Sequence, residues 1–385
     1  MSGFVFTTTR QLVNEAGAVS KLGELCQQLN IQNPIIITDP GIVNAGLLER
    51  ATAPIEAAGL QVHCYTDVVA DPPEAIVEAA IAFAKGHQAD GIIGFGGGSA
   101  MDTAKLVALI VCSGEALADI YGVEQVKGSR LPLIQVPTTA GTGSEVTPIA
   151  IVTTGASTKM GVVSGCLQPD AAVLDAELTL GLPAHVTAST GVDAMVHAIE
   201  AYTSAFKKNP YSDMLARESL RLLSDNIRVA VKEPSNLVAR QNMLLGATMA
   251  GQAFANSPVA AVHALAYPLG GQFHISHGLS NSLVLPQVLR FNAREASSLY
   301  AELAPSIMGH KAPSGSDAEV TEGLIVYLEE MIADLALPMR LRDLDIPEEA
   351  LVGLASDAMG QQRLLVNNPR EVSESDALDI YRAIF

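Results

Sequence analysis

The chain of 385 residues has no tryptophan, only four cysteines and far fewer basic than acidic side chains. Its 23 Lys and Arg against 41 Asp and Glu give a formal net charge of −18 at pH 7. Nucleic acids and anionic membranes attract basic patches, so this balance argues against both as partners. The cysteines form no C-x-x-C pair, which excludes a zinc knuckle and a thioredoxin-type redox site.

Long apolar runs are also missing, and the longest falls far short of the ~20 residues that a membrane span needs. Residues 1–7 have neither the basic nor the apolar segment of a signal peptide. The cysteines at positions 26, 64, 112 and 166 are widely separated, as expected for reduced, mostly buried thiols. These absences predict a soluble, cytoplasmic protein.

Apolar residues, by contrast, make up 49% of the chain and charged residues 17%, which excludes a disordered or fibrous protein. The length favours two domains. Up to about residue 180, short apolar β-rich runs alternate with helical ones, which predicts a parallel sheet covered by helices on both faces. The expected strands are 34–38, 61–65, 91–95, 133–136 and 150–152, and the expected helices are 43–58, 73–85 and one through residue 112.

The pattern changes after residues 181–183, where long Ala/Leu-rich helical segments begin, with Pro and Gly mainly at their breaks. No second β-α alternation follows, and residues 311–317 form a polar loop. We therefore expect an α/β domain over residues 1–180 and an all-helical domain over residues 181–385. Sites at such domain interfaces are common.

A glycine cluster, Gly94-Phe95-Gly96-Gly97-Gly98-Ser99-Ala100-Met101-Asp102, lies where an expected strand becomes a helix. Glycines let the backbone approach a pyrophosphate, and the free N–H groups of a helix start receive its charge. Ser99 stands where a G-x-G-x-x-G motif would have its last glycine, so a plain tight turn is the alternative. No Gly-Lys-Ser/Thr follows, which excludes a Walker A loop.

Two further polar patches follow other expected strands. Asp39, before Pro-Gly, can accept both hydroxyls of an adenosine ribose and would repel a 2′-phosphate; the alternative is a turn-capping aspartate. The segment 137–145 offers the hydroxyls of Thr138, Thr139 and Thr142. Three such patches at three strand ends predict a bound nucleotide.

A possible metal site lies in the helical half. Asp193 and His197 are four residues apart and so share one face of an expected helix over 187–205. His263, His274 and His277 follow far downstream. One carboxylate with neutral imidazoles suits Fe(II), Zn(II), Co(II) or Mn(II), although each residue alone is equally typical of a helix cap or a core histidine. Spacing alone leaves His274 and His277 as alternatives.

Taken together, these segments resemble the iron-dependent (group III) alcohol dehydrogenases, a family that includes lactaldehyde reductase and propanediol oxidoreductase. The resemblance covers essentially the whole chain and is carried by residues 96–105, 137–145, 191–200 and 263–278, and by Asn368-Pro369-Arg370. It implies a Rossmann-like α/β domain followed by an all-α domain, the dehydroquinate synthase-like fold.

The resemblance also implies roles for individual residues. Asp193, His197, His263 and His277, rather than His274, would bind Fe(II), with Zn(II) as a possible substitute. Gly97, Gly98 and Ser99 would bind the pyrophosphate, with Asp102 nearby, and Thr138, Thr139 and Thr142 would lie along the cofactor. Asp39 would favour NAD over NADP. Phe254 would line the substrate pocket.

The chain departs from the family pattern in three places. Tyr267 replaces a histidine often linked to proton relay, and its phenol has a reference pKa near 10, so His274 becomes a candidate for proton transfer together with Tyr267. The usual Asn-Pro-Thr is Asp71-Pro72-Pro73, which puts an amide contact to the cofactor in doubt. The third departure is the segment 361–366, which is longer than in the propanediol enzymes. If its Arg363 faces the pocket, a carboxylate-bearing substrate is expected; the alternative is a solvated surface arginine.

We therefore expect an NAD(H)- and metal-dependent alcohol dehydrogenase or aldehyde reductase for small primary alcohols and aldehydes, assembled as a homodimer or larger homo-oligomer. One alternative within the family is a 4-hydroxybutyrate-like hydroxyacid dehydrogenase or a transhydrogenase. A lyase of the dehydroquinate-synthase type is a second alternative, although the region around the metal ligands has few basic residues for a phosphorylated substrate. A non-catalytic metal- or nucleotide-binding module is the third.

Overall fold

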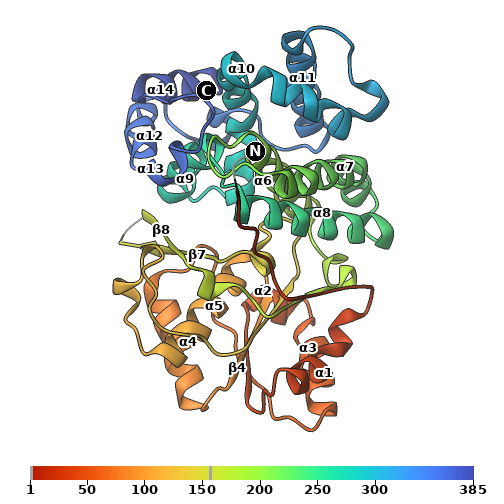
Figure 1. Ribbon diagram of the computed structural model, residues 1–385, viewed down its shortest axis with the longest axis vertical. Coiled ribbons are helices and arrows are strands. Elements are labelled where there is room, and N and C mark those ends of the chain that lie inside the picture. The colour runs from red at the N-terminus through yellow and green to blue at the C-terminus, as the bar shows by residue number, and fades with distance from the viewer. Residues whose placement is uncertain (1–2, 156–157) are drawn as a thin grey trace. The chain divides into compact units, whose positions relative to one another are not determined.

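A computed structural model describes residues 3–155 and 158–385 (Figure 1). In it the chain forms two compact units, each with its own core. One comprises residues 8–181 and contains the main sheet. The other comprises residues 182–385 together with residues 3–7 and is helical.

The first unit is built on a six-stranded parallel sheet in the order β1-β9-β6-β4-β2-β3. This sheet and the helical C-terminal half confirm the predicted fold class. The strands are β1 (Gln11–Asn14), β2 (Pro34–Ile37), β3 (His63–Tyr65), β4 (Gly91–Gly96), β6 (Leu133–Pro137) and β9 (Ala171–Leu174).

Both faces of this sheet are covered, because successive residues of its apolar strands point to opposite sides. Ile35 and Ile92 pack with the helices α4 and α5 on one face, whereas Ile36 and Ile93 pack with α1 and α3 on the other. Figure 1 shows the two helix pairs on either side of β4. The helices of this unit are α1 (Leu22–Gln28), α2 (Pro40–Asn44), α3 (Leu48–Ala57), α4 (Glu74–Gly86) and α5 (Gly98–Ser113).

Several details differ from the sequence prediction. The single helix expected over 43–58 is two helices, α2 and α3, because Gly46 adopts a left-handed backbone with a φ of 69° between them. The strand expected over 150–152 belongs to a second, three-stranded sheet, in which β7 pairs antiparallel with β8. This sheet contains β5 (Gly122–Val123), β7 (Ile149–Thr154) and β8 (Thr158–Val163).

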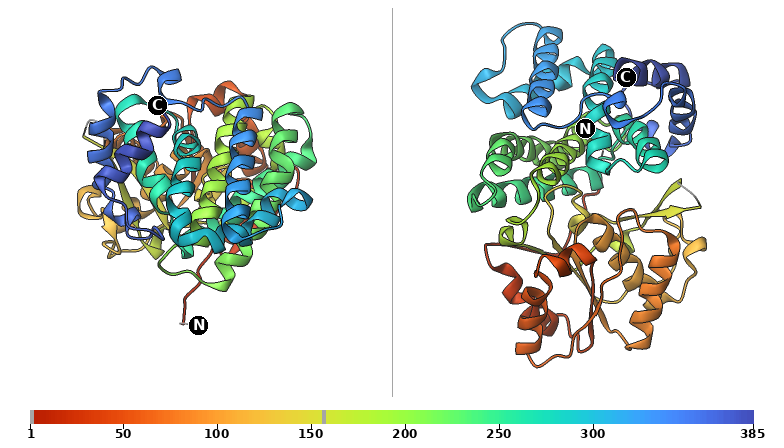
Figure 2. Two further views of the ribbon diagram at one scale, coloured as in Figure 1. Left: turned by 90° about the horizontal axis from the view of Figure 1, so that it is seen from above. Right: turned by 180° about the vertical axis from the view of Figure 1, so that it is seen from behind.

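The helical unit is centred on α6, which is buried along most of its length. Helices α7, α8 and α10 pack against it, and Figure 2 shows the green and cyan helices side by side. Its helices are α6 (Ala184–Thr203), α7 (Pro210–Lys232), α8 (Leu237–Asn256), α9 (Ala261–Phe273), α10 (His277–Met308), α11 (Asp317–Asp334), α12 (Ala350–Met359), α13 (Gln362–Leu365) and α14 (Glu374–Ala383).

Residues 3–7 group with this helical unit, whereas the expected division at residue 180 assigns them to the α/β domain. The amide of Thr7 donates to the Asn256 side chain at 2.8 Å, and the Asn256 amide donates back to the Thr7 carbonyl at 2.8 Å. No helix within the described ranges is long and apolar enough to cross a membrane.

Candidate functional site

Helix α6 presents two of the predicted metal ligands on one face. Asp193 and His197 are one turn apart, and both are buried, with 1% and 4% exposure. Gly191, two residues before Asp193 and therefore on another side of α6, allows close packing, because a Cβ at this position would lie 2.7 Å from Met243 Cε and 2.8 Å from Ile227 Cδ1. The side of α6 that contains Gly191 is therefore packed closely against α7 and α8.

The other two ligands come from the first turns of α9 and α10. His263 is the third residue of α9, and His277 is the first residue of α10. Gly278 brings the start of α10 against α6, since a Cβ there would lie 2.4 Å from the Ser189 carbonyl oxygen. A side chain at position 278 would therefore push His277 away from Asp193.

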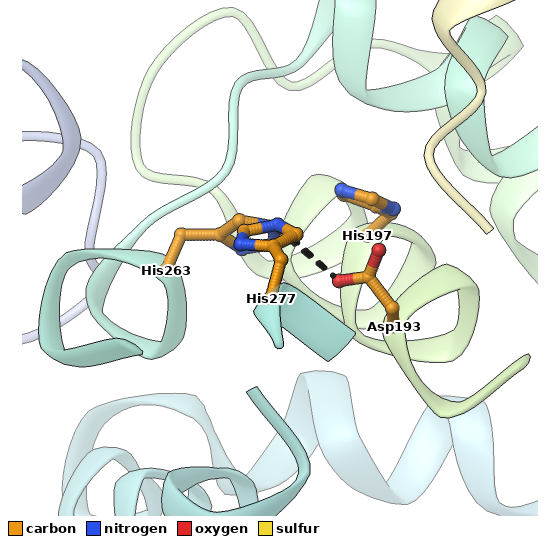
Figure 3. A group of neighbouring side chains, drawn as sticks. All are labelled: Asp193, His197, His263 and His277. Carbon is orange, nitrogen blue, oxygen red and sulfur yellow. Dashed lines mark ion pairs between the residues drawn. The ribbon is translucent and has the colours of Figure 1, made fainter. Parts of the chain in front are cut away.

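These four side chains converge, and Figure 3 shows the carboxylate and the three imidazole rings meeting in one small region. One ligand atom from each of Asp193, His197, His263 and His277 lies within 4.8 Å of the others. Asp193 Oδ1 is 3.5 Å from His277 Nε2 and 4.0 Å from His263 Nε2.

The donor set fits a divalent transition metal. Burial raises the pKa of Asp193, but the three imidazoles and the Asn281 amide outweigh burial, so its pKa is below the usual value and the side chain is a carboxylate. One carboxylate and three imidazoles are ligands that Fe(II) and Zn(II) both accept. Asp193, His197 and His263 are buried and His277 is partly exposed, and three imidazoles around one carboxylate are the arrangement expected of such a site.

Two neighbours of the cluster were not predicted. Glu200, 4% exposed, accepts from the His263 ring at 2.6 Å between Oε2 and Nδ1. Asn281, fully buried, donates from Nδ2 to Asp193 Oδ1 at 2.6 Å. Helical spacing could have identified both, because Glu200 lies three residues after His197 and Asn281 lies four residues after His277.

Of the predicted substrate and proton-relay residues, Phe254 and Tyr267 lie beside the cluster, whereas His274 does not belong to it. The Phe254 ring stacks on the His197 imidazole with centroids 4.4 Å apart, and the Tyr267 ring centroid is 5.9 Å from that of His277. His274 is exposed and ends α9 in a left-handed conformation, with a φ of 56°. It is not a member of the cluster, so the structure favours His277 of the two alternatives that spacing left open.

Arg363 lies in the short helix α13 and is exposed. Within the described ranges its guanidinium has no ion pair, and only its backbone carbonyl is used, by the Asn367 amide at 3.0 Å. Among the described residues, therefore, no carboxylate balances the charge of this guanidinium.

In the α/β unit, the three polar patches follow three adjacent parallel strands. Asp39 comes two residues after β2, the glycine cluster lies at the end of β4, and Thr138 follows β6. These three strands are neighbours in the sheet, in the order β6-β4-β2. The carboxyl ends of neighbouring parallel strands share one edge of a sheet, which is where α/β folds bind ligands.

The patches also touch one another. A Cβ on Gly98 would lie 2.8 Å from Thr142 Cγ2, and one on Gly97 would lie 3.6 Å from Thr139 Oγ1. Gly96 has a φ of 153°, and a Cβ on it would lie 3.1 Å from Asp39 Oδ2. At Gly96 and Gly98 a side chain would therefore crowd its neighbours, whereas at Gly97 a Cβ would make an ordinary contact.

Helix α5 starts at Gly98, and no side chain caps its first N–H groups. These donors therefore stay available to an anion at the end of β4. Asp39 serves as the cap of α2, since its Oδ1 accepts from the Ile42 amide at 3.1 Å. Its Oδ2 accepts no hydrogen bond from the described residues, so the capping role leaves one carboxylate oxygen for a ligand.

Asp102 uses both carboxylate oxygens on the protein itself. Oδ1 accepts from Ser144 Oγ at 2.6 Å, and Oδ2 accepts from the Ile151 amide at 2.9 Å. The fully buried Lys105, whose pKa burial lowers, donates to Ser144 Oγ at 2.7 Å and to the Ile149 carbonyl at 2.6 Å. These bonds anchor α5 to the segment after β6.

The departure at Asp71-Pro72-Pro73 also reaches the glycine cluster. The Asp71 amide donates to Ser99 Oγ at 3.2 Å. Its carboxylate forms an ion pair with Lys159 at 2.6 Å, so the charge that replaces the family's neutral amide is balanced by a lysine of β8.

Comparison with known proteins agrees with this geometry. Residues 9–176 match the family "Iron-containing alcohol dehydrogenase", and residues 187–385 match "Fe-containing alcohol dehydrogenase family, C-terminal". The long-chain-alcohol dehydrogenase 1 of Geobacillus thermodenitrificans is 41% identical over 372 residues, which are 96% of this chain and 93% of that protein.

Solved structures are similar over the whole chain. A 1,3-propanediol oxidoreductase has a TM-score of 0.96 at 32% identity and full coverage of both chains. A sulfoacetaldehyde reductase from Bifidobacterium kashiwanohense, in complex with NAD+, has a TM-score of 0.88 at 28% identity, with 100% of this chain and 99% of that chain covered. These matches confirm the predicted resemblance and set aside a lyase or a non-catalytic module. The chain therefore belongs to the iron-containing alcohol dehydrogenase family and is an oxidoreductase that acts on CH–OH groups.

Proposed function

We propose that the protein interconverts small primary alcohols and aldehydes with NAD(H), using one divalent metal ion held by Asp193, His197, His263 and His277. The observation that carries this proposal is the convergence of these four donor groups within 4.8 Å. The family assignment supplies iron as the first candidate, and zinc has the same ligand preferences.

The bound ion supplies Lewis acidity, which lowers the pKa of an alcohol or polarises an aldehyde. The protein residues do the rest. Asp193, as a buried carboxylate, offsets the ion's charge. Phe254, stacked on His197, presents an apolar ring beside the cluster and suits the carbon chain of a substrate.

We propose NAD rather than NADP as the hydride carrier. In the α/β unit, Asp39 retains one carboxylate oxygen that faces Gly96, and this charge favours a ribose and repels a 2′-phosphate. The uncapped start of α5 at Gly98 suits the pyrophosphate. The NAD+ in the sulfoacetaldehyde reductase structure gives this part of the proposal independent support.

The proton has two candidate carriers. Tyr267 lies beside His277, and His274 is exposed to solvent at the end of α9. We propose that Tyr267 orients the hydroxyl proton and that His274 passes it to water. Four unbridged cysteines suit the reducing cytoplasm, where we place a homodimer or larger homo-oligomer.

The test is anaerobic NADH oxidation by metal-stripped protein that has been reloaded with Fe(II) or with Zn(II). Propanal, lactaldehyde and succinic semialdehyde serve as substrates. We expect Fe(II) to restore turnover with propanal or lactaldehyde. Tight NADH binding with no turnover under any metal would contradict the proposal.

A second candidate function, the reduction of an acidic aldehyde, is favoured by the uncommitted guanidinium of Arg363. Guanidinium pairs well with carboxylate and sulfonate-like oxyanions, and the similar sulfoacetaldehyde reductase has an anionic substrate in its name. Arg363→Ala would then raise KM for succinic semialdehyde and leave KM for propanal unchanged. An unchanged KM for succinic semialdehyde in the variant would return Arg363 to a solvated surface role.

A further inference from the structure

We propose that Glu200 and Asn281 are positioning residues that prepare the ligand cluster for its metal before the metal arrives. The proposal rests on the proposed metal-binding function of Asp193, His197, His263 and His277. Neither residue is a ligand itself. Each holds a ligand in the one orientation and proton arrangement that leaves a lone pair available.

Glu200 fixes the tautomer of His263. A carboxylate can only accept, so the contact of 2.6 Å between Glu200 Oε2 and His263 Nδ1 places the ring proton on Nδ1. Nε2 then carries a lone pair. Because Nε2 is the nitrogen that faces Asp193, at 4.0 Å from its Oδ1, the lone pair points into the cluster.

The second oxygen of Glu200 makes its own hydrogen bond, which fixes the orientation of the carboxylate. Oε1 accepts from the Val262 amide at 2.7 Å, at the start of α9. Both oxygens therefore act as acceptors, one on the backbone before His263 and one on its ring. A glutamine has a single acceptor, so it cannot satisfy both donors. It would lose the Val262 bond or force the His263 proton onto Nε2.

Asn281 performs the same task from α10. Its Nδ2 donates to Asp193 Oδ1 at 2.6 Å and lies 3.3 Å from Nε2 of both His263 and His277. An amide nitrogen has two hydrogens, so it can serve the carboxylate and one imidazole lone pair together. The carboxylate and the imidazole that receive these two hydrogens must be acceptors, which is the form that a metal also needs.

The free end of Asn281 argues against a purely structural role. Its Oδ1 is buried and accepts no hydrogen bond from the described residues, which costs folding free energy. An apolar side chain of similar volume would avoid that cost. The amide is therefore explained by what its nitrogen does, and that nitrogen contacts only ligand residues.

Two variants and two matched controls test the proposal. Glu200→Gln and Asn281→Leu remove the positioning contacts. Glu302→Gln removes a carboxylate that bonds Tyr202 away from the cluster, and Asn292→Leu removes a buried amide of the same helix, α10, that pairs with Asn368 at 2.9 Å. Co(II) affinity is measured from the visible absorption of the bound ion in competition with a chelator. We expect 10–100-fold weaker binding in the two positioning variants and wild-type binding in the controls.

A second measurement needs no metal. The ¹⁵N chemical shifts of the imidazoles in the metal-free wild type report which ring nitrogen carries the proton. We expect His263 to be protonated on Nδ1 and bare at Nε2, and Glu200→Gln to shift that signal. A proton on Nε2 of the wild type, or unchanged Co(II) affinity in both variants, would overturn the proposal. Failure of the wild type to bind any metal would instead overturn the proposed function, and the ¹⁵N shifts would still decide the role of Glu200.

Discussion

The two candidate sites of this protein differ in composition: one is formed by side chains and the other mainly by backbone. In the helical unit, the metal cluster consists of side chains on α6, α9 and α10, buried and fixed by other side chains such as Glu200 and Asn281. In the α/β unit, the nucleotide site consists mainly of backbone, exposed by glycines at the ends of β4 and its neighbours. The first site therefore depends on which functional groups are present, and the second depends on which are absent.

The largest expected effect is the loss of one metal ligand. His263→Ala removes a buried imidazole of the cluster, and we expect turnover to fall by more than the roughly 100-fold that marks the loss of a supporting residue. Metal content, measured by atomic emission, should fall in parallel. NADH affinity should stay within twofold of wild type, because the α/β unit is untouched. His274→Ala is the control, and it should keep its metal. Full activity in His263→Ala would contradict the assignment.

The converse variant adds a methyl group to the nucleotide site. Gly98→Ala would place a Cβ 2.8 Å from Thr142 Cγ2, and such overpacking costs about 1–3 kcal/mol. We expect NADH binding to weaken by about 5–100-fold at 1.4 kcal/mol per tenfold, with metal content unchanged. Gly86→Ala is the matched control, since a Cβ there meets no atom within 4 Å. Because the chain has no tryptophan, cofactor fluorescence reports binding without indole background. Equal NADH affinities in the two variants would remove the glycine cluster from the site.

The smallest expected effect concerns the choice between two cofactors. Asp39→Asn keeps an oxygen that can cap α2 through the Ile42 amide but removes the negative charge. A charge pair near a protein surface contributes on the order of 1 kcal/mol, so the ratio of NADPH to NADH affinity should rise about fivefold. Melting temperature should change little, because the cap is retained. An unchanged ratio would leave Asp39 as a helix cap alone.

The sequence supported the helical site and the nucleotide site to different extents. Asp193 and His197 are recognisable from their spacing on one helix, whereas His263 and His277 join them only through tertiary packing at Gly278. Spacing left His274 as an alternative to His277, and in the structure His274 ends α9 in a left-handed conformation outside the cluster that contains His277. Glu200 and Asn281 escaped prediction although their helical spacing places them on the ligand faces.

In the α/β unit, the predicted strands include β2 and β4, which contain consecutive Ile residues. The strands β1 and β9 were missed because β1 has polar residues at both ends, Gln11 and Asn14, and β9 begins with two alanines, which have little preference for strands. The helix expected over 43–58 failed at Gly46, where a local backbone conformation outweighed the helical pattern. Short-range signals therefore located the patches, and the order of the strands brought them together.

The most direct test of the account measures metal content and NADH affinity on the same sample, before and after treatment with a chelator. The account predicts one ion per chain before treatment, none after it, and an NADH affinity that stays within twofold of its starting value. A protein that holds no ion would contradict the metal site. A protein that loses NADH binding together with its metal would contradict the independence of the two binding sites.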